Sequence, residues 1–337
     1  MKQSISVLIP CYNGANWIDR CFKSLTKQGI DNFDIIVVDD CSTDNSLEIL
    51  EKWKTKFPSL KIVKHESNRG SAGTRNTLIS LVKTDYFIFL DVDDTLAKNA
   101  LNNLHKQIVK SNNRIDVVLG KSKILYANKN NKILWQCFYL AQSKFFSTLY
   151  SSQKFLSHCH YANVWGILTK KKYWDSLNIS FNENTEIEDI VPSFIMIYNA
   201  KAFCAITSCI YNYTDRPNSL FHIKNFSEKR FIDYQEQLFL CFSEIKKRYS
   251  LDDLNLLSCF FVKFKSEMGI IKHFFTKLAK KDEKHIKMIE DLKSRIYNDF
   301  LKKNHNSLIK SKRWSSFFKS CFFKSFFKNQ IKESNLI

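Results

Sequence analysis

The chain has 337 residues, 44% of them hydrophobic, which is enough for two domains or for one α/β domain with a sizeable appendage. Its 52 Lys and Arg exceed its 33 Asp and Glu, so the formal net charge is +19 and polyanionic partners are favoured. The sequence shows no run of 18 apolar residues and no signal-peptide core, so we expect neither a membrane-spanning helix nor a cleavable leader.

Short apolar runs alternate with helical patterns along the first hundred residues. Strands are predicted at residues 5–9, 35–38, 60–64 and 86–90, with helices between them that end at about residues 28, 57 and 81. Strands that alternate with helices predict a mainly parallel sheet with helices on both faces. Further short strands are expected near 117–119 and 132–139, and after residue 226 the pattern becomes helical and rich in Lys and Phe. The predicted fold class is therefore α/β, with a helical and basic C-terminal region.

Polar or turn-forming residues follow the first, second and fourth predicted strands. In chain order they are Pro10, Tyr12 and Asn13, then Asp39 and Asp40, then an acidic turn at residues 91–94. Ligands on open parallel sheets bind at the carboxyl ends of the strands. We therefore expect these groups to meet at one ligand site.

The acidic turn places Asp91, Asp93 and Asp94 within four residues. Three carboxylates this close repel one another unless a cation lies among them. Oxygen ligands suit Mg²⁺ or Mn²⁺, and such ions commonly keep substrate phosphate oxygens as further ligands. The alternative is a solvated turn that caps a helix beginning after Asn99, but the apolar strand directly before the turn favours a metal site.

Candidate nucleotide contacts lie beside the acidic turn. Asp40, with Asp39 next to it, can accept hydrogen bonds from a base imide or a ribose hydroxyl, and Tyr12 can pack its ring on a nucleobase. The alternatives are a helix N-cap for the aspartates and a proline-stiffened turn for Tyr12. Arg75 is expected at the start of a helix, where it meets a base or a phosphate or else is a surface arginine. The glycine spacing excludes a P-loop and a dinucleotide fingerprint.

A second acidic group lies at residues 186–189. A general base must face the bound acceptor, away from the metal. Asp189 is the candidate for this role, although the sequence by itself does not decide between a base and a structural carboxylate. Glu186 is expected to be solvated.

Four ordered segments resemble family-2 glycosyltransferases, which have the GT-A fold. They are residues 5–13 (ISVLIPCYN), 37–44 (VVDDCSTD), 68–76 (NRGSAGTRN) and 89–94 (FLDVDD). A weaker resemblance, to bacterial members that build surface polysaccharides and lipooligosaccharides, continues through residues 164–168, Phe181, 188–189, 211–213, Arg216 and 218–219. Two positions depart from the pattern: Ile167 stands where many relatives carry Lys, and Thr214 where many carry Arg.

The resemblance implies inverting transfer from a nucleoside-diphosphate sugar, usually a UDP-sugar, to a lipid-linked or growing surface glycan. It implies a nucleotide site formed by Pro10, Tyr12, Asp40 and Arg75, with Asn13 and Asp39 beside them. Asp91 and Asp93 serve ribose, diphosphate and a divalent Mn²⁺ or Mg²⁺, and Asp94 is a direct ligand in some members. Asp189 takes the role of catalytic base. His222 is a further candidate metal ligand, although a surface histidine is the simpler alternative.

The chain is expected to have three parts. The resemblance implies that residues 1–114 form the half that binds the nucleotide sugar and residues 115–225 the acceptor half. The sequence pattern predicts that residues 226–337 form a helical basic region with possible membrane contact. Within the last part, residues 301–332 hold nine Lys and Arg, no Asp or Glu, and interleaved aromatic residues. This pattern favours contact with an anionic membrane, with a helix packed on the catalytic domain as the alternative. No recognisable nucleic-acid-binding module is present, so nucleic acid is not a predicted partner.

The ten cysteines are scattered without paired spacing, which suits a reducing cytoplasm, and the sequence His158-Cys159-His160 lacks zinc-site spacing. We therefore expect a cytoplasmic protein on the inner face of the cell membrane, and the sequence sets no oligomeric state. Two rival functions remain. A sugar-nucleotide nucleotidyltransferase has a related fold but carries a Gly-rich, Lys-containing loop after its first strand, unlike residues 12–15. A non-catalytic scaffold would use only the basic region to bind polyanions.

Overall fold

The computed structural model describes residues 5–127, 133–139 and 163–215, together with Lys229, Arg230, Asp233, Glu236, Gln237, Leu240 and Cys241. The chain divides into two compact units, Met1–Cys241 and Phe242–Ile337, and all described residues belong to the first. Several predicted features lie outside the described residues: the segment 158–160, Arg216, residues 218–219, His222 and the basic segment 301–332.

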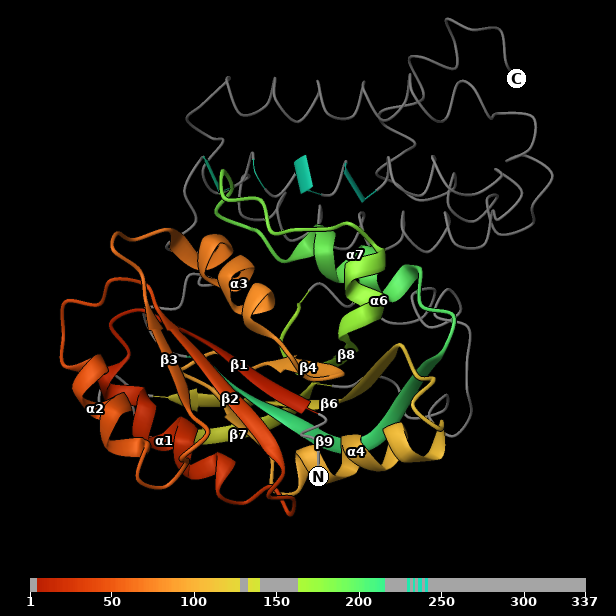
Figure 1. Ribbon diagram of the computed structural model, residues 1–337, viewed down its shortest axis with the longest axis horizontal. Coiled ribbons are helices and arrows are strands. Elements are labelled where there is room, and N and C mark those ends of the chain that lie inside the picture. Colours follow the sequence, from red (N-terminus) through yellow and green to blue (C-terminus); the bar gives the residue numbers. More distant parts are fainter. Residues whose placement is uncertain are drawn as a thin grey trace, which may run out of the picture. The chain divides into compact units, whose positions relative to one another are not determined.

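A nine-stranded sheet forms the centre of the described unit (Figure 1). Its strand order is β3-β2-β1-β4-β8-β6-β9-β5, and β7 pairs with β6. The strands are β1 (Ile5–Cys11), β2 (Phe33–Asp39), β3 (Lys61–Lys64), β4 (Tyr86–Phe89), β5 (Thr95–Leu96), β6 (Val117–Ala127), β7 (Ile133–Tyr139), β8 (Ile167–Lys170) and β9 (Phe203–Asp215).

The four N-terminal strands β3, β2, β1 and β4 pair in parallel, which confirms the predicted parallel sheet for this half. Beyond β4 the sheet is mixed, because β8 runs antiparallel to both β4 and β6, whereas β9 runs parallel to β6. The antiparallel direction of β8 brings its N-terminal end to the edge at which β1, β2 and β4 end. The sheet therefore presents the ends of these four strands along one edge.

Helices cover both faces of the sheet, as predicted: α1, α2 and α4 lie on one face, and α3, α6 and α7 on the other (Figure 1). Their bounds are α1 (Ala15–Leu25), α2 (Ser46–Trp53), α3 (Gly70–Leu81), α4 (Ala100–Lys110), α6 (Lys171–Ser176) and α7 (Ile190–Tyr198). The amphipathic pattern explains α1, which buries Trp17, Ile18, Cys21, Phe22 and Leu25 on one side. By contrast α7 is apolar all round, and all of its residues except Val191 are buried.

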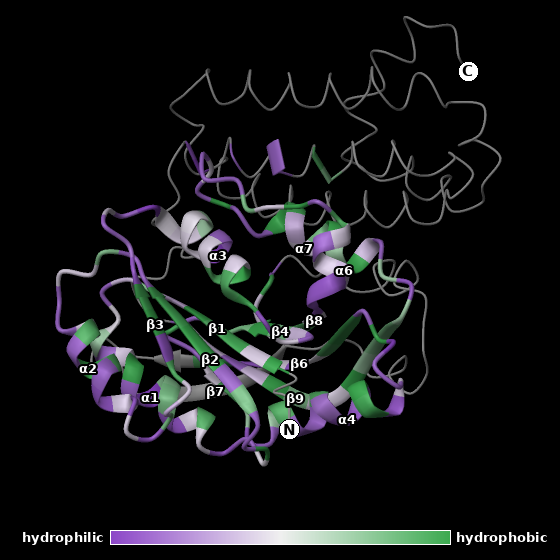
Figure 2. Cartoon of the chain, viewed as in Figure 1, coloured by the Kyte–Doolittle hydropathy of each residue, from purple (hydrophilic) through white to green (hydrophobic). Residues whose placement is uncertain are grey.

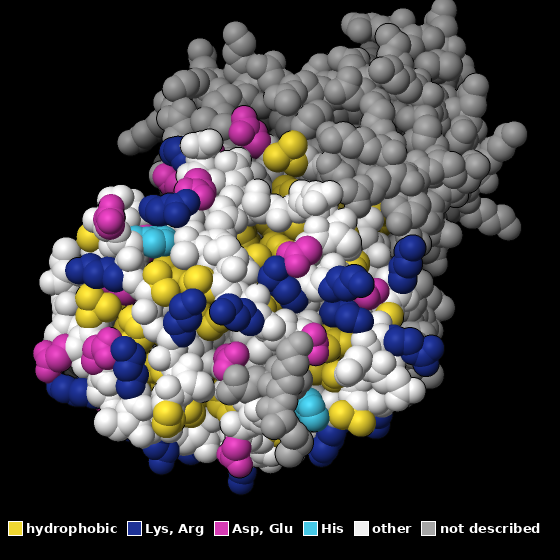
Figure 3. Space-filling view, in the orientation of Figure 1, with side chains coloured by type: hydrophobic (Ala, Val, Ile, Leu, Met, Phe, Trp, Pro, Cys, Tyr) yellow, Lys and Arg dark blue, Asp and Glu magenta, His cyan; other side chains and the backbone are white. Residues whose placement is uncertain are grey.

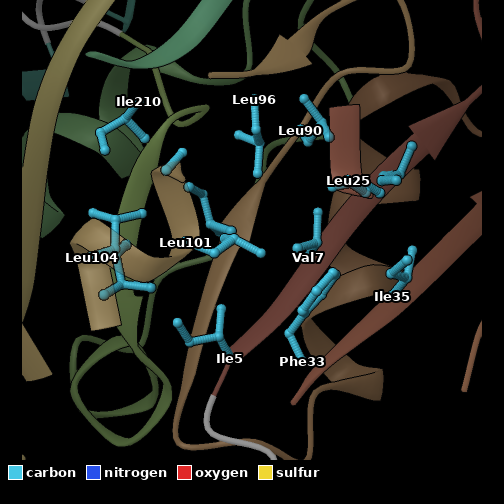
Figure 4. Close-up of a cluster of buried hydrophobic side chains, with 14 of the residues drawn as sticks. Ile5, Val7, Leu25, Phe33, Ile35, Leu90, Leu96, Leu101, Leu104 and Ile210 are labelled. Carbon is cyan, nitrogen blue, oxygen red and sulfur yellow. The ribbon is translucent and has the colours of Figure 1, made fainter. Parts of the chain in front are cut away.

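The main apolar core lies between the sheet and the face covered by α1 and α4 (Figure 4). Alternate residues of β1 and β2 point into it, and Leu25 of α1 with Leu101 and Leu104 of α4 close it. Green strands at the centre and purple on the outer faces of the helices show the same division in Figure 2. This two-sided burial fixes the strands in place, so their polar ends are held at defined positions along the edge.

On the face shown in Figure 3, Lys and Arg side chains are spread among Asp and Glu and do not gather in one patch. Within the described part of the chain, every helix is too short or too polar to cross a bilayer.

Candidate active site

A cavity of about 390 Å³ opens at the edge of the sheet where β1, β2 and β4 end and β8 begins. Seven residues predicted from the sequence line it together: Pro10, Tyr12, Asp40, Arg75, Asp91, Asp93 and Asp189. They come from three strand ends, from the first turns of α3, and from the residue that precedes α7. The parallel strands bring together groups that are up to 179 positions apart in the sequence, since the cavity holds both Pro10 and Asp189.

Asn13 and Asp39 do not line the cavity, because both are engaged in the loops behind it. Asn13 has a left-handed backbone (φ 49°), and its side-chain oxygen accepts a hydrogen bond from the Thr43 backbone N–H at 2.9 Å. Asp39 is fully buried and accepts from the Ser42 N–H at 3.0 Å. These contacts bind the loop after β1 to the loop after β2. In this structure both residues stabilise the loops behind the cavity, and their contact with a nucleotide stays a prediction.

Asp94 does not line the cavity, and its role as a metal ligand stays a prediction. Its side chain is 1% exposed, and both of its oxygens are occupied. One accepts from the Tyr211 hydroxyl at 2.7 Å and the other from the Thr214 backbone N–H at 2.6 Å. Burial, together with the nearby charges of Asp93 and Asp91, raises the pKa of Asp94 well above its usual range. Asp94 therefore joins the acidic turn to β9.

Arg20 of α1 was not predicted as a site residue, but it contacts the acidic turn. Its guanidinium donates to the Asp93 carbonyl oxygen and to the Thr214 side-chain oxygen. Burial lowers the pKa of Arg20, and the negative charges of Asp94 and Asp93 oppose this shift. Arg20 thus connects α1 to the acidic turn and to β9. This contact could not be predicted from the sequence, because Arg20 lies on the polar side of an amphipathic helix, where arginine is common.

Arg75 of α3 links the two acidic groups of the sequence. One of its terminal nitrogens lies 3.0 Å from an Asp91 oxygen, and the other forms an ion pair with Glu188. The residue is only 6% exposed, and its guanidinium lies about 6 Å from the ring centroids of Phe89 and Phe181. A buried guanidinium between two carboxylates offsets their repulsion and fixes the distance between the acidic turn and the loop before α7.

Asp40 is held by His65, a second residue that the sequence reasoning missed. The carboxylate is 2% exposed, and one of its oxygens accepts from the His65 ring at 2.7 Å and from the Arg69 N–H at 2.9 Å. The other ring nitrogen of His65 lies 2.9 Å from the Thr77 hydroxyl of α3. This chain of contacts fixes the orientation of the Asp40 carboxylate in the cavity wall. A polar residue directly after the third strand was the available signal.

Asp189 occupies the N-cap position of α7 and is 8% exposed at the cavity wall. Burial raises its pKa to about 6; the positive charge of Arg75 opposes this shift and the negative charge of Asp91 adds to it. A carboxylate with this pKa is ionised at neutral pH and basic enough to accept a proton from a hydroxyl in a transition state. Arg230 and Glu186 line the same part of the cavity.

Two of the carboxylates predicted to bind a divalent cation, Asp91 and Asp93, line the cavity. Over the described ranges, no three His, Cys, Asp or Glu side chains are arranged as a complete metal site. Mg²⁺ and Mn²⁺ are often held by one or two carboxylates, with substrate phosphates and water completing the coordination. The donor set therefore fits an ion that binds together with a phosphate-bearing substrate.

Comparison with known proteins identifies the class. The model of the glycosyl transferase family 2 matches residues 6–175. The processive diacylglycerol beta-glycosyltransferase of Mycoplasma pneumoniae is 30% identical over 265 residues, which are 76% of each chain. The poly(ribitol-phosphate) beta-glucosyltransferase of Bacillus spizizenii is 38% identical over 122 residues, 35% of this chain but only 19% of that protein.

Solved structures agree on the fold. Staphylococcus aureus TarS 1–349 in complex with UDP-GlcNAc superposes with a TM-score of 0.59 at 24% identity, covering 76% of this chain and 70% of that one. The mannosyltransferase PcManGT of Pyrobaculum calidifontis superposes with a TM-score of 0.50 at 14% identity, covering 94% and 83%. The fold is that of the GT-A glycosyltransferases, as the resemblance implied. The chain belongs to glycosyl transferase family 2, and its relatives include transferases of surface glycans and glycolipids.

Proposed function

We propose that the chain transfers a hexose or N-acetylhexosamine, with inversion, from a UDP-sugar to a hydroxyl of a lipid-linked or growing surface glycan. One observation carries the proposal: a single cavity holds Asp91 and Asp93 together with Asp189, and Arg75 bridges the two groups. Two similar proteins support the choice of substrates. TarS was solved with UDP-GlcNAc, and the relative from Mycoplasma pneumoniae is a processive diacylglycerol beta-glycosyltransferase.

In this proposal the nucleotide binds on the side of the cavity formed by the ends of β1 and β2. Tyr12 is 52% exposed and offers its ring to the base, and Pro10 stiffens the turn that carries it. Asp40, oriented by His65, accepts a hydrogen bond from the base or the ribose. Asp91 and Asp93 hold Mn²⁺ or Mg²⁺, which when bound neutralises the charge of the departing diphosphate.

Asp189 acts as the catalytic base. The acceptor oxygen attacks the anomeric carbon on the face opposite the diphosphate, and a new C–O bond forms as the bond from that carbon to the diphosphate oxygen breaks. UDP leaves with the electron pair of the broken bond, and Asp189 takes the proton of the acceptor hydroxyl. Attack from the opposite face inverts the anomeric configuration. Removal of a positioned base typically costs about 10²–10⁴-fold in rate.

We further propose that residues 1–114 form the donor half and residues 115–225 the acceptor half, and that the region from 226 to 337 contacts an anionic membrane on its cytoplasmic side. The basic composition of residues 301–332 supports membrane contact. A nucleotidyltransferase is the less favoured alternative, because no lysine is found among the described residues that line the cavity.

The test is a screen of UDP-sugars for release of UDP, with Mn²⁺ and with a chelator, using the full chain and the variants Asp93→Ala and Asp189→Asn. The matched control is Asp175→Asn, an exposed carboxylate on α6 that pairs with Lys171. We expect Mn²⁺-dependent UDP release with one donor, lost in the first two variants and retained in the control. Release of pyrophosphate from UTP and a sugar 1-phosphate, with no release of UDP from any UDP-sugar, would favour the nucleotidyltransferase. Unchanged cellular glycans in both variants would favour the scaffold.

A further inference from the structure

The cavity has an aromatic side chain at each end, separated by the acidic turn. Tyr12 follows β1, the acidic turn follows β4, and Trp165 directly precedes β8. These strands are neighbours in the order β1-β4-β8. Adjacent strands lie about 4.8 Å apart, so Tyr12 and Trp165 start from positions roughly 10 Å apart along the edge. A nucleotide on Tyr12 therefore leaves Trp165 on the far side of the reacting centre.

Trp165 is fixed next to the acidic turn by backbone contacts. It forms an isolated bridge with Phe89 at the end of β4, and the following Gly166 N–H donates to the Phe89 carbonyl at 3.2 Å. Gly166 has φ +70°, and an added Cβ would come within 3.1 Å of Tyr211, so only glycine suits this position. The close approach allows the Trp165 ring to lie flat against β9.

Trp165 stacks with two tyrosines of β9. Its centroid lies 4.4 Å from that of Tyr211 at an interplanar angle of 18°, and 5.7 Å from that of Tyr213 at 13°. Tyr211 is fully buried, whereas Trp165 and Tyr213 are partly exposed and line the cavity. The Tyr211 hydroxyl accepts from the Asp91 N–H at 3.1 Å and donates to Asp94 at 2.7 Å. The stack is thus anchored to the acidic turn.

We infer that Trp165, supported by Tyr211 and Tyr213, forms the acceptor subsite and takes a pyranose ring; this rests on the proposed function. A pyranose has an apolar face of C–H groups that packs on an indole ring, and hydroxyls at its edge that reach charged groups. Asp189 and Arg230, in the wall of the same cavity, are such groups. An acyclic glycerol or ribitol unit has no flat apolar face and gains little from the stack. The acceptor therefore ends in a sugar ring.

The test compares two acceptors with the same tail, octyl β-glucoside and 1-O-octylglycerol, using the UDP-sugar that supports UDP release. For the unmodified chain we expect kcat/KM to be at least about tenfold higher for octyl β-glucoside. Trp165→Ala should bring this ratio close to one through a higher KM for the glucoside, and Trp165→Phe should keep most of it. Trp53→Ala, which removes a partly buried indole on α2 away from the cavity, is the control and should leave the ratio unchanged.

The ratio separates a subsite from a folding defect, since misfolding lowers transfer to both acceptors equally. Equal use of the two acceptors by the unmodified chain, or an equal loss with both in Trp165→Ala, would overturn the inference. A higher KM for the UDP-sugar with an unchanged ratio would place the donor on Trp165 and would also overturn it. UDP release by hydrolysis with transfer to neither acceptor overturns the inference alone, whereas absence of UDP release with every donor overturns the proposed function.

Discussion

At the scale of single residues, Asp189 is a buried carboxyl whose pKa is raised to about 6. As the proposed base it would have to be ionised, so we expect kcat/KM for the acceptor to rise with pH through about 6 and then level off. Arg75 lowers this pKa and Asp91 raises it, so both charges set the midpoint of the acidic limb together with burial. Initial rates of transfer across this range measure it. A rate that is flat down to about pH 4.5 would contradict a base with this pKa.

The same pKa predicts a cost to stability. The pKa of Asp189 is raised on folding from 3.8 to about 6, so the folded state binds a proton more tightly and loses stability as pH rises between these values. Above about pH 6 the ionised group costs on the order of 2–3 kcal/mol. Asp189→Asn should therefore lose transfer activity, and its free energy of unfolding relative to that of the unmodified chain should increase from about pH 4.5 to about pH 7.5. Urea unfolding of both proteins at these two pH values measures the difference. The same difference at both pH values would contradict the prediction.

Replacing Asp94 should mainly lower stability, whereas replacing Asp93 should mainly lower activity. Asp94→Ala leaves the Tyr211 hydroxyl and the Thr214 N–H buried without an acceptor, so we expect a loss of about 2–4 kcal/mol in unfolding free energy. Asp93→Ala should lower the rate and the response to Mn²⁺ with a smaller effect on stability. Thermal unfolding and Mn²⁺ titration of the rate separate the two. A metal response that is lost in an Asp94 variant of unchanged stability would instead support Asp94 as a metal ligand.

Most of the cavity residues could be predicted because each lies at the end of a strand that is recognisable in the sequence as an apolar run. Tyr12, Asp40 and Asp91 are examples, since parallel strands must end at one edge. Arg20 and His65 were not predicted, because what places them is a contact with a residue distant in the chain and not a local pattern. The contacts of Asp94 were not predicted for the same reason: spacing groups it with Asp91, whereas its hydrogen bonds to Tyr211 and Thr214 are long-range.

At the scale of secondary-structure elements, the pairing of β6 with β9 requires a residue without a side chain at Gly120. The register shifts next to Gly120, and a Cβ added there would lie 2.0 Å from the Ile210 Cγ1 atom. We expect Gly120→Ala to cost about 1–3 kcal/mol by overpacking. Combining it with Ile210→Ala, which removes that carbon, should give a loss smaller than the sum of the two single losses. Additive losses in urea unfolding would show that the two positions do not meet.

The elements themselves were predicted unevenly. The first four strands and the helices between them follow from local periodicity, and their bounds shift by only a few residues; α2, for example, ends at Trp53 and not near residue 57. In the mixed half the strands predicted near 117–119 and 132–139 are present as β6 and β7, but the strand directions were not predicted, since the direction of β8 depends on the long connection that precedes it. Which strands pair with one another depends on contacts between segments far apart in the sequence, so the pairing of β6 with β9 could not be predicted from local patterns. The prediction of the parallel half does not depend on that pairing.

At the scale of the whole molecule, charge is the feature with a functional consequence. Residues 221–337 hold 25 Lys and Arg against 13 Asp and Glu. If this region contacts an anionic membrane, the full chain should cosediment with vesicles that contain phosphatidylglycerol and not with phosphatidylcholine alone, and added salt should release it. Replacing Lys312, Arg313 and Lys319 with Glu should weaken binding, whereas Lys52→Glu and Lys54→Glu on α2 should not. Equal binding to both kinds of vesicle would contradict the proposal.

The central claim is that the acidic turn and its neighbours form a site for a UDP-sugar and a divalent cation. Calorimetric titration of UDP into the full chain tests it without any acceptor or knowledge of the sugar. The account predicts one UDP site in the presence of Mn²⁺, with affinity lowered by at least about tenfold by a chelator or by Asp93→Ala, and unchanged by Asp175→Asn. Failure to bind UDP, or binding that is indifferent both to Mn²⁺ and to Asp93, would contradict it.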